Sequence, residues 1–212
     1  MKKIHIINIT LNIITFLGIS SLIFFNKFYS ADSIFDRSIH SVFEVKCETE
    51  GDISYGSAVA FEKDLLVTNF HVISYNTTTT RKIHDFIMLR SPFSNDYFEC
   101  TVKTYDENND IAILEKMSSV KLEIKTIKTA KKNSKPGEKC FAIGNANNLG
   151  IGITEGNIVN NSVSIKINDF SRKMIQANVT SSNGSSGGAL LNKKGELIGI
   201  TTLKLVDSYG LL

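Results

Sequence analysis

The chain has 212 residues, 42% of them hydrophobic, which is enough for one large all-β domain or two small halves with an ample core. The formal net charge is +3, but Lys2, Lys3 and Lys27 all precede Asp32, so basic and acidic residues balance from Asp32 onward. No basic stripe with interleaved aromatic residues follows, which excludes the charge pattern typical of nucleic-acid binding.

The N-terminal segment has the features of a targeting sequence. Lys2 and Lys3 precede an apolar run over residues 4–25, whose dense second half is typical of a secretory signal. The whole run is also about long enough to span a bilayer as a helix. Cleavage after Ser30 or after Ala31 would leave a bulky aromatic residue three positions back, so a cleaved signal and an uncleaved anchor stay equally open. We expect residues 1–31 to be a signal peptide or membrane anchor.

Either alternative places the rest of the chain outside the cytoplasm, because the charged end of such a segment stays inside. We therefore expect an exported protein that is periplasmic, at the cell surface or secreted. If the signal is uncleaved, residues 4–25 would be its contact with the membrane.

The chain after this segment predicts short strands. Residues 41–48 alternate, with Phe43, Val45 and Cys47 on one face, and residues 97–104 and 163–168 alternate in the same way. Turn residues punctuate the chain between such runs, and the lysine-rich segment 115–138 separates two halves. Strands at this spacing indicate a sandwich or a barrel.

Two polar residues stand at strand edges. His71 follows the apolar run 65–67, and Asp110 opens the apolar run 111–114. Alone, such a histidine is more often structural, and such an aspartate is usually a turn residue. A serine that completes the order His, Asp, Ser makes a chance arrangement harder to accept.

That serine lies in the small-residue segment 183–191. A serine becomes a good nucleophile when a base takes its proton and backbone N–H groups hold the oxyanion that forms. Gly184 lets the backbone turn so that its N–H and that of Ser186 can converge, while Gly187 and Gly188 keep bulk away from a substrate carbonyl. On this segment alone, a flexible loop before a strand is an equally good interpretation.

Taken in order, these motifs resemble those of the trypsin-like (chymotrypsin-fold) serine proteases, most closely the bacterial HtrA/Deg group. The matching pieces are residues 56–61, 68–72, 110–114, 142–145, 153–156, 175–176, 184–188 and 195–200. The resemblance implies an all-β fold of two antiparallel six-stranded barrels, preceded by the N-terminal hydrophobic helix. The protease domain would span residues 32–212, with the first barrel at about 38–118 and the second at about 135–212.

The resemblance also implies a serine endopeptidase that acts through an acyl-enzyme. Ser186 would attack the scissile carbonyl, His71 would move the proton, and Asp110 would orient the imidazole. The N–H groups of Gly184 and Ser186 would form the oxyanion hole. No metal or other cofactor is implied, and the partners would be polypeptide substrates, including unfolded proteins, in quality control or processing. Oligomers are compatible with this interpretation.

Nearby alternatives fit the pattern less well. Ser182 and Ser185 are not followed by the Gly-Gly pair, and Asp106 does not adjoin the apolar strand. Ser185 stands where zymogen-activated trypsins carry an aspartate, so we expect no activation by a newly freed N-terminus. Because the sequence stops at Leu212, we expect no PDZ module and a truncated second barrel, with its last strand short or missing.

The resemblance places the primary specificity pocket at Thr180, its floor, and at Thr201, Thr202 and Leu203, its wall. No acidic residue stands at Thr180, so we expect cleavage after small or medium apolar side chains rather than after Lys or Arg. The three cysteines cannot all pair, and we favour three unpaired thiols.

Two other interpretations stay open. One is a catalytically inactive protease homologue that binds extended peptides through the cleft between the two expected barrels, where the triad would lie. The other is an unrelated exported β protein in which the triad is a coincidence.

Overall fold

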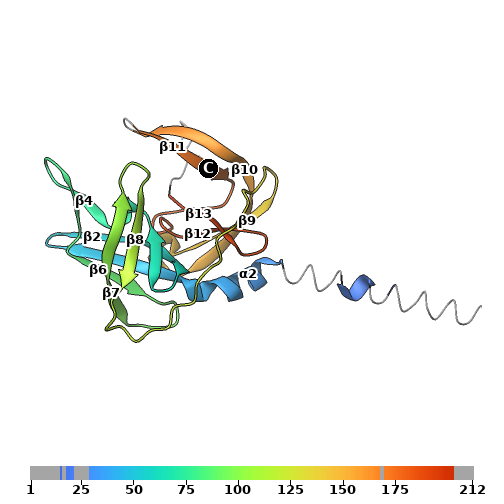
Figure 1. The fold of residues 1–212 in the computed structure, drawn as a ribbon, viewed down its shortest axis with the longest axis horizontal. Coiled ribbons are helices and arrows are strands. Elements are labelled where there is room, and N and C mark those ends of the chain that lie inside the picture. Colours follow the sequence, from blue (N-terminus) through green and yellow to red (C-terminus); the bar gives the residue numbers. More distant parts are fainter. Residues whose placement is uncertain (1–14, 16–17, 22–28, 168–169, 203–212) are drawn as a thin grey trace, which may run out of the picture.

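The computed structural model of the chain describes residues 15, 18–21, 29–167 and 170–202. Two strand systems lie side by side, with a short helix, α2 (Ala31–Ser38), near the place where they meet (Figure 1). The prediction of a mostly β chain is confirmed.

The first strand system is a closed barrel with strand order β1-β2-β3-β8-β7-β6, and all of its pairings are antiparallel. Its strands are β1 (Val42–Thr49), β2 (Asp52–Glu62), β3 (Leu65–Thr68), β6 (Phe86–Arg90), β7 (Tyr97–Asp106) and β8 (Ile111–Lys116). A small hairpin of β4 (Ser74–Asn76) and β5 (Arg81–Ile83) forms a separate sheet. The first predicted barrel, with six antiparallel strands, is thus confirmed.

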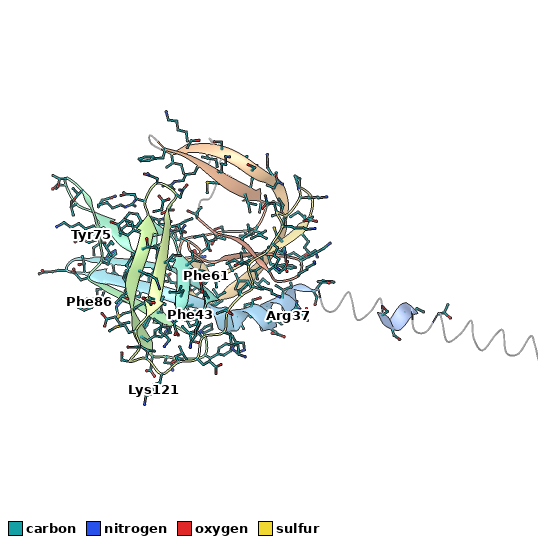
Figure 2. All side chains as sticks on the ribbon, viewed as in Figure 1. Arg37, Phe43, Phe61, Tyr75, Phe86 and Lys121 are labelled. Carbon is teal, nitrogen blue, oxygen red and sulfur yellow. The ribbon has the colours of Figure 1, made fainter. Side chains whose placement is uncertain are left out.

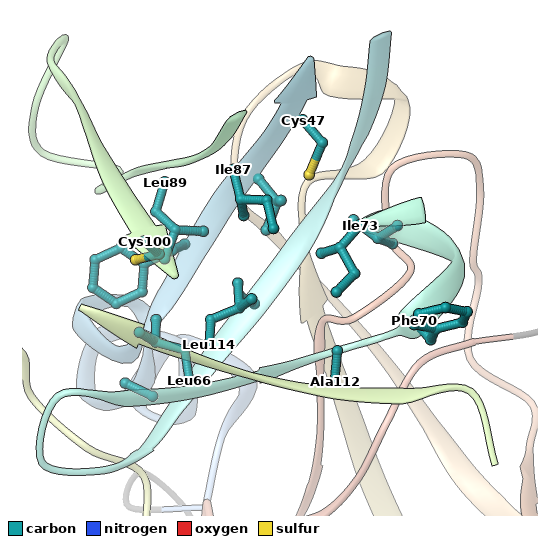
Figure 3. Close-up of a cluster of buried hydrophobic side chains, with 14 residues drawn as sticks. Cys47, Leu66, Phe70, Ile73, Ile87, Leu89, Cys100, Ala112 and Leu114 are labelled. Carbon is teal, nitrogen blue, oxygen red and sulfur yellow. The ribbon is translucent and has the colours of Figure 1, made fainter. Parts of the chain in front are cut away.

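The barrel core accounts for the alternation in β1. Phe43, Val45 and Cys47 are at most 2% exposed and belong to one buried cluster, which also contains Leu66 and Leu89 (Figure 3). Burying a side chain of this size contributes roughly 1.5–3 kcal/mol. The alternating pattern therefore fixes the register, because a slip by one residue would turn this face outward.

The second strand system is a sheet of five strands with the order β11-β10-β9-β12-β13. The strands are β9 (Lys139–Gly144), β10 (Gly152–Ile167), β11 (Phe170–Ala177), β12 (Ala189–Asn192) and β13 (Leu197–Ile200). Among the described residues this sheet curls without closing, as half of a barrel. The six-stranded second barrel is therefore not complete in the part of the chain that is described.

A second hydrophobic cluster lies between the barrel and the sheet. It joins Val42 and Val59 of the barrel to Phe141 and Leu191 of the sheet, and Ile34 of α2 is 0% exposed within it. Phe61 of β2 also packs against this cluster, in the middle of the molecule (Figure 2). This shared core fixes how the two halves sit relative to each other.

After α2, the described part of the chain has three single helical turns, η1 (Ile39–Ser41), η2 (Phe70–Val72) and η3 (Ala146–Asn148). Most of the expected N-terminal hydrophobic helix lies outside the described residues. Among those that are described, no helix has both the length and the apolar character needed to cross a bilayer.

The three cysteines, Cys47, Cys100 and Cys140, are unpaired and buried. Burial raises the pKa of the Cys47 and Cys100 thiols to about 12 and that of Cys140 to about 11. They are packing residues in the cores of the two halves rather than reactive thiols.

Candidate active site

His71 lies in η2, which directly follows strand β3 and the residue Asn69. Its neighbours Phe70 and Val72 are 2% and 1% exposed and pack in the barrel core. The side chain of His71 itself is 35% exposed. The two buried neighbours hold the backbone in place and leave the imidazole at the surface.

Asp110 ends the turn between β7 and β8 and has a positive φ of 57°, which aspartate tolerates better than most residues. Its N–H donates to the carbonyl oxygen of Glu107 (3.2 Å). Its own carbonyl oxygen accepts from the side-chain amide of Asn69 (2.9 Å). The residue two before His71 therefore ties the Asp110 turn to the histidine segment.

The carboxylate of Asp110 binds His71 at two points. The ring atom Nδ1 lies 2.8 Å from Oδ2, and the backbone N–H of His71 donates to Oδ1 (2.9 Å). The hydroxyl of Thr202 also donates to Oδ2 (2.8 Å). The Asp110 side chain is only 5% exposed, so these bonds form away from bulk water.

The electrostatics of Asp110 follow from these contacts. Burial raises its pKa, but the hydrogen bond and charge of His71, together with the Thr202 hydroxyl, lower it by more, so the pKa lies below its ordinary value. The carboxylate is therefore ionised at neutral pH and can only accept hydrogen bonds. Nδ1 of His71 must then carry the proton, and in the neutral ring Nε2 is left as an acceptor.

Ser186 lies in a tight loop before β12. The loop is built from turns in which the N–H of Ser185 donates to Ser182 and the N–H of Gly188 donates to Ser185. Gly184 and Gly187 have φ values of +87° and +82°. A Cβ on Gly187 would lie 2.0 Å from the carbonyl oxygen of Ser57, so the glycine there is required by close packing as well as by its φ.

Two backbone N–H groups of this loop differ from the others in their hydrogen bonding. Those of Ser185, Gly187 and Gly188 each donate to a carbonyl oxygen. Those of Gly184 and Ser186 donate to no acceptor among the residues that the structure describes. Two unused donors thus lie on either side of Ser185, close to the proposed nucleophile.

Strand β2 brings the histidine and serine segments together. A Cβ on Gly56 would meet Val72, the neighbour of His71, at 2.6 Å and the carbonyl oxygen of Ser186 at 3.1 Å. The N–H of Ser57 donates to that same carbonyl oxygen (2.8 Å). The segments of His71 and Ser186 therefore both contact the same short stretch of β2 backbone, at Gly56 and Ser57.

The predicted pocket residues have other polar partners. The hydroxyl of Thr201 donates to the carbonyl oxygen of Ser185, and that of Thr202 donates to Asp110. The carbonyl oxygen of Thr180 accepts from the Thr154 hydroxyl (3.0 Å). Leu203 lies outside the described residues. Thr201 and Thr202 thus support the loop and the carboxylate, which we did not predict from their position in the motif.

Other contributors also escaped the sequence reasoning. Ser57 lies inside a matching motif that does not single out its hydroxyl, and Asn69 adjoins His71 without a distinctive pattern. Arg172 of β11 approaches Asp110, with Nη1 3.7 Å from Oδ2. No feature of the sequence around Arg172 signals this contact, because it depends on how a distant hairpin folds over. No group of three or more His, Cys, Asp or Glu side chains suited to a metal occurs among the described residues.

Comparisons with known proteins agree with this architecture. The sequence profile of the trypsin-like peptidase domain matches residues 56–200. Serine protease HTRA3 of Homo sapiens is 32% identical over 158 residues, which cover 72% of this chain and 34% of that protein. Serine endoprotease DegS of Salmonella typhimurium is 31% identical over 178 residues, which cover 83% of this chain and 46% of that protein.

A solved structure gives the same fold. The active form of the Rv3671c protease from M. tuberculosis superposes with a TM-score of 0.71 at 18% identity, over 84% of this chain and 76% of that one. This match confirms the expected chymotrypsin-like fold.

The chain spans about a third of the length of HTRA3 and about half that of DegS. The match over residues 56–200 nevertheless covers more than half of this chain and includes His71, Asp110 and Ser186. The chain therefore belongs to the trypsin-like peptidase domain family, with HtrA and DegS proteases among its homologues.

Proposed function

We propose that the chain is a serine endopeptidase in which Ser186 is the nucleophile, His71 the general base and acid, and Asp110 the group that orients the imidazole. The observation that carries the proposal is the pair of bonds between Asp110 and His71, at 2.8 and 2.9 Å. Together these bonds fix both the backbone and the ring of His71 on one carboxylate whose side chain is 5% exposed.

The proton path follows from the tautomer of His71. With Nδ1–H donated to Asp110, Nε2 is free to accept the proton of the Ser186 hydroxyl as the serine oxygen attacks the carbonyl carbon. The imidazolium that forms is stabilised by the adjacent carboxylate. His71 then returns the proton to the leaving amine, the peptide bond breaks, and an acyl-enzyme remains on Ser186. Water attacks that ester by the same route in reverse.

The unused N–H groups of Gly184 and Ser186 support the oxyanion part of the proposal. The tetrahedral intermediate carries a negative oxygen, and two N–H donors held in advance would stabilise it as it forms. Removing one such donor in a comparable enzyme costs about 10²–10³-fold in kcat. The loop hydrogen bonds of Ser185, Gly187 and Gly188 would keep both donors from turning away.

The substrates we propose are polypeptides, unfolded ones included, cleaved after small or medium apolar residues. Thr180 carries no charge to bind Lys or Arg, and the resemblance to HtrA and DegS proteases suggests a role in quality control or processing of exported proteins. We also propose that the domain extends from about residue 32, with its N-terminal segment directing export to the periplasm, the cell surface or the medium.

A peptide-library cleavage assay tests the proposal on the full chain. We expect hydrolysis after residues such as Ala, Val or Leu, and none in Ser186→Ala or His71→Ala. Dominant cleavage after Lys or Arg would contradict the assignment of Thr180. A folded wild-type protein that binds the peptides without cleaving them would contradict catalysis and favour the inactive homologue.

A further inference from the structure

The hairpin of β10 and β11 reaches the turn that carries Asp110. In Figure 1 the two strands form a curved hairpin along the upper edge of the molecule. From β11, Arg172 Nε donates to the carbonyl oxygen of Asn108 (2.6 Å) and Nη2 donates to that of Glu107 (3.2 Å). Nη1 lies 3.7 Å from Oδ2 of Asp110. Three nitrogens of one guanidinium thus face Glu107, Asn108 and Asp110, which belong to a single turn.

The part of this contact nearest Asp110 is shielded from water, whereas its two carbonyl acceptors belong to exposed residues. The side chains of Arg172 and Asp110 are 14% and 5% exposed. Charge-assisted hydrogen bonds in such surroundings are stronger than neutral ones, and the planar guanidinium has the fork geometry needed to bind two acceptors at once. Lysine has the same charge but lacks this fork.

The turn needs such support because Asp110 is in the left-handed region, with φ of 57°. Aspartate tolerates this region better than most residues, but the conformation still costs free energy that contacts around it must offset. From the barrel itself, Asn69 binds the Asp110 carbonyl oxygen, and the side chain of Asp106 accepts from Asn109. From the other half of the molecule, Arg172 and Thr202 make the described polar contacts with residues 106–110.

Oδ2 of Asp110 is the oxygen that matters most here. It accepts from His71 Nδ1 and from the Thr202 hydroxyl, both at 2.8 Å, and it is also the oxygen that faces Arg172. A small rotation of the turn would lengthen the bond to His71. Arg172 opposes that rotation, because its two carbonyl partners precede Asp110 by two and three residues.

We infer that Arg172 is a positioning residue, which holds the Asp110 turn from the second half of the molecule so that the carboxylate stays aligned with His71. The inference rests on the proposed function and extends it to a residue outside the triad. It also makes the β10–β11 hairpin part of the machinery, because a hairpin that moved away would release the turn.

The test compares Arg172→Met and Arg172→Lys with the wild type and with Lys173→Met. Lys173 is the next residue on β11 and its side chain is exposed, so its substitution removes one positive charge without touching the turn. The readouts are kcat and KM for peptide hydrolysis, thermal unfolding, and the downfield proton NMR resonance of His71 Nδ1–H. Arg172→Gln, whose amide can still donate to one carbonyl group, replaces Arg172→Met if that variant does not fold.

We expect kcat to fall between about 10-fold and 100-fold in Arg172→Met with KM nearly unchanged, since a misplacement of about 1 Å can cost on the order of 100-fold. The kcat of Arg172→Lys should fall by a similar factor, because lysine lacks the guanidinium fork. The His71 proton resonance should broaden or disappear in both, whereas Lys173→Met should match the wild type in every readout.

Two results would overturn the inference. One is an Arg172→Met protein with wild-type kcat and an intact resonance. The other is full rescue by Arg172→Lys, which would reduce the role to charge alone. The resonance does not depend on turnover. Suppose that the wild type cleaves no peptide but shows the resonance, and that only the Arg172 variants lose it. This result would contradict catalysis and leave the positioning role standing.

Discussion

The hydroxyl of Ser57, in the first barrel, donates a hydrogen bond to the carbonyl oxygen of Gly184, in the loop of the proposed nucleophile (2.8 Å). The same hydroxyl accepts from the N–H of Asn145 (2.9 Å), and Ser57 is 0% exposed. Its backbone N–H also donates to Ser186 (2.8 Å). One residue of the barrel therefore contacts the loop at both of its proposed oxyanion positions.

We expect Ser57→Ala to weaken both stability and catalysis. The change leaves the Gly184 carbonyl and the Asn145 N–H without a partner, and a buried unpaired group costs about 1–3 kcal/mol. The free energy of unfolding and kcat should both fall. Ser118→Ala, at an exposed position, should change neither. An unchanged kcat in Ser57→Ala would show that the loop holds its shape without this hydroxyl.

Gly187 should tolerate no side chain because of close packing, and a comparison with Gly137 separates this packing effect from backbone strain. Gly187 and Gly137 both have φ of +82°, but a Cβ on Gly137 would meet nothing within 4 Å, whereas one on Gly187 would lie 2.0 Å from Ser57. Gly137→Ala should cost only the backbone strain, about 1–2 kcal/mol. Gly187→Ala should cost more than about 4 kcal/mol and abolish hydrolysis. Equal losses of stability in denaturant unfolding would contradict the packing argument.

Asp110→Asn should separate geometry from charge, because asparagine also accepts a left-handed φ. The corresponding change in a Ser-His-Asp enzyme lowers kcat on the order of 10⁴-fold, since the imidazole takes the other tautomer. We expect a loss of similar size here with the protein folded. A variant that keeps more than a tenth of wild-type kcat would argue against the role of Asp110.

The same substitution predicts a pH dependence of stability. The pKa of Asp110 lies below its ordinary value of 3.8, so its ionised form stabilises the fold above about pH 3.8, and this contribution is lost as the pH falls below that value. Wild type should therefore exceed Asp110→Asn in Tm by more at about pH 7 than at about pH 3. A difference in Tm that grows on acidification would contradict the lowered pKa.

Thr202→Val tests the third bond to the carboxylate. Valine has nearly the same shape as threonine but cannot donate to Oδ2 of Asp110, and a hydrogen bond to a charged group is worth about 1.5–3 kcal/mol. We expect kcat/KM to fall about 10-fold or more, with Thr202→Ser close to wild type and the exposed Thr101→Val unaffected. Wild-type kcat/KM in Thr202→Val would contradict the role of this bond, and impairment of Thr202→Ser alone would point to the methyl group.

The parts of this structure that could be predicted from sequence are those with a local signature. Alternation in residues 41–48 predicts the inward face of β1 because the side-chain period of a strand is two. The glycines around Ser186 signal a tight turn because only glycine accepts those backbone angles at low cost. The order of His71, Asp110 and Ser186 became informative through the resemblance to a known family.

The parts that could not be predicted depend on contacts between distant segments. Arg172 is one polar residue on an alternating strand until the hairpin brings it to Asp110, which is 62 positions away in the chain. Thr202 is placed in the pocket wall by its motif, yet its hydroxyl binds the carboxylate. Ile34 lies next to the predicted targeting segment, and its burial between the two halves has no local signal.

Covalent labelling by a fluorophosphonate probe, read by intact mass and peptide mapping, tests the central claim most directly. A fluorophosphonate reacts with a serine only when a base removes the hydroxyl proton and donors stabilise the oxyanion, so it needs no knowledge of the substrate. We predict a single adduct on Ser186, none on Ser185 or Ser182, and none in Ser186→Ala or His71→Ala. Two results would contradict the account: a folded wild-type chain that takes up no label, or equal labelling of the wild type and His71→Ala.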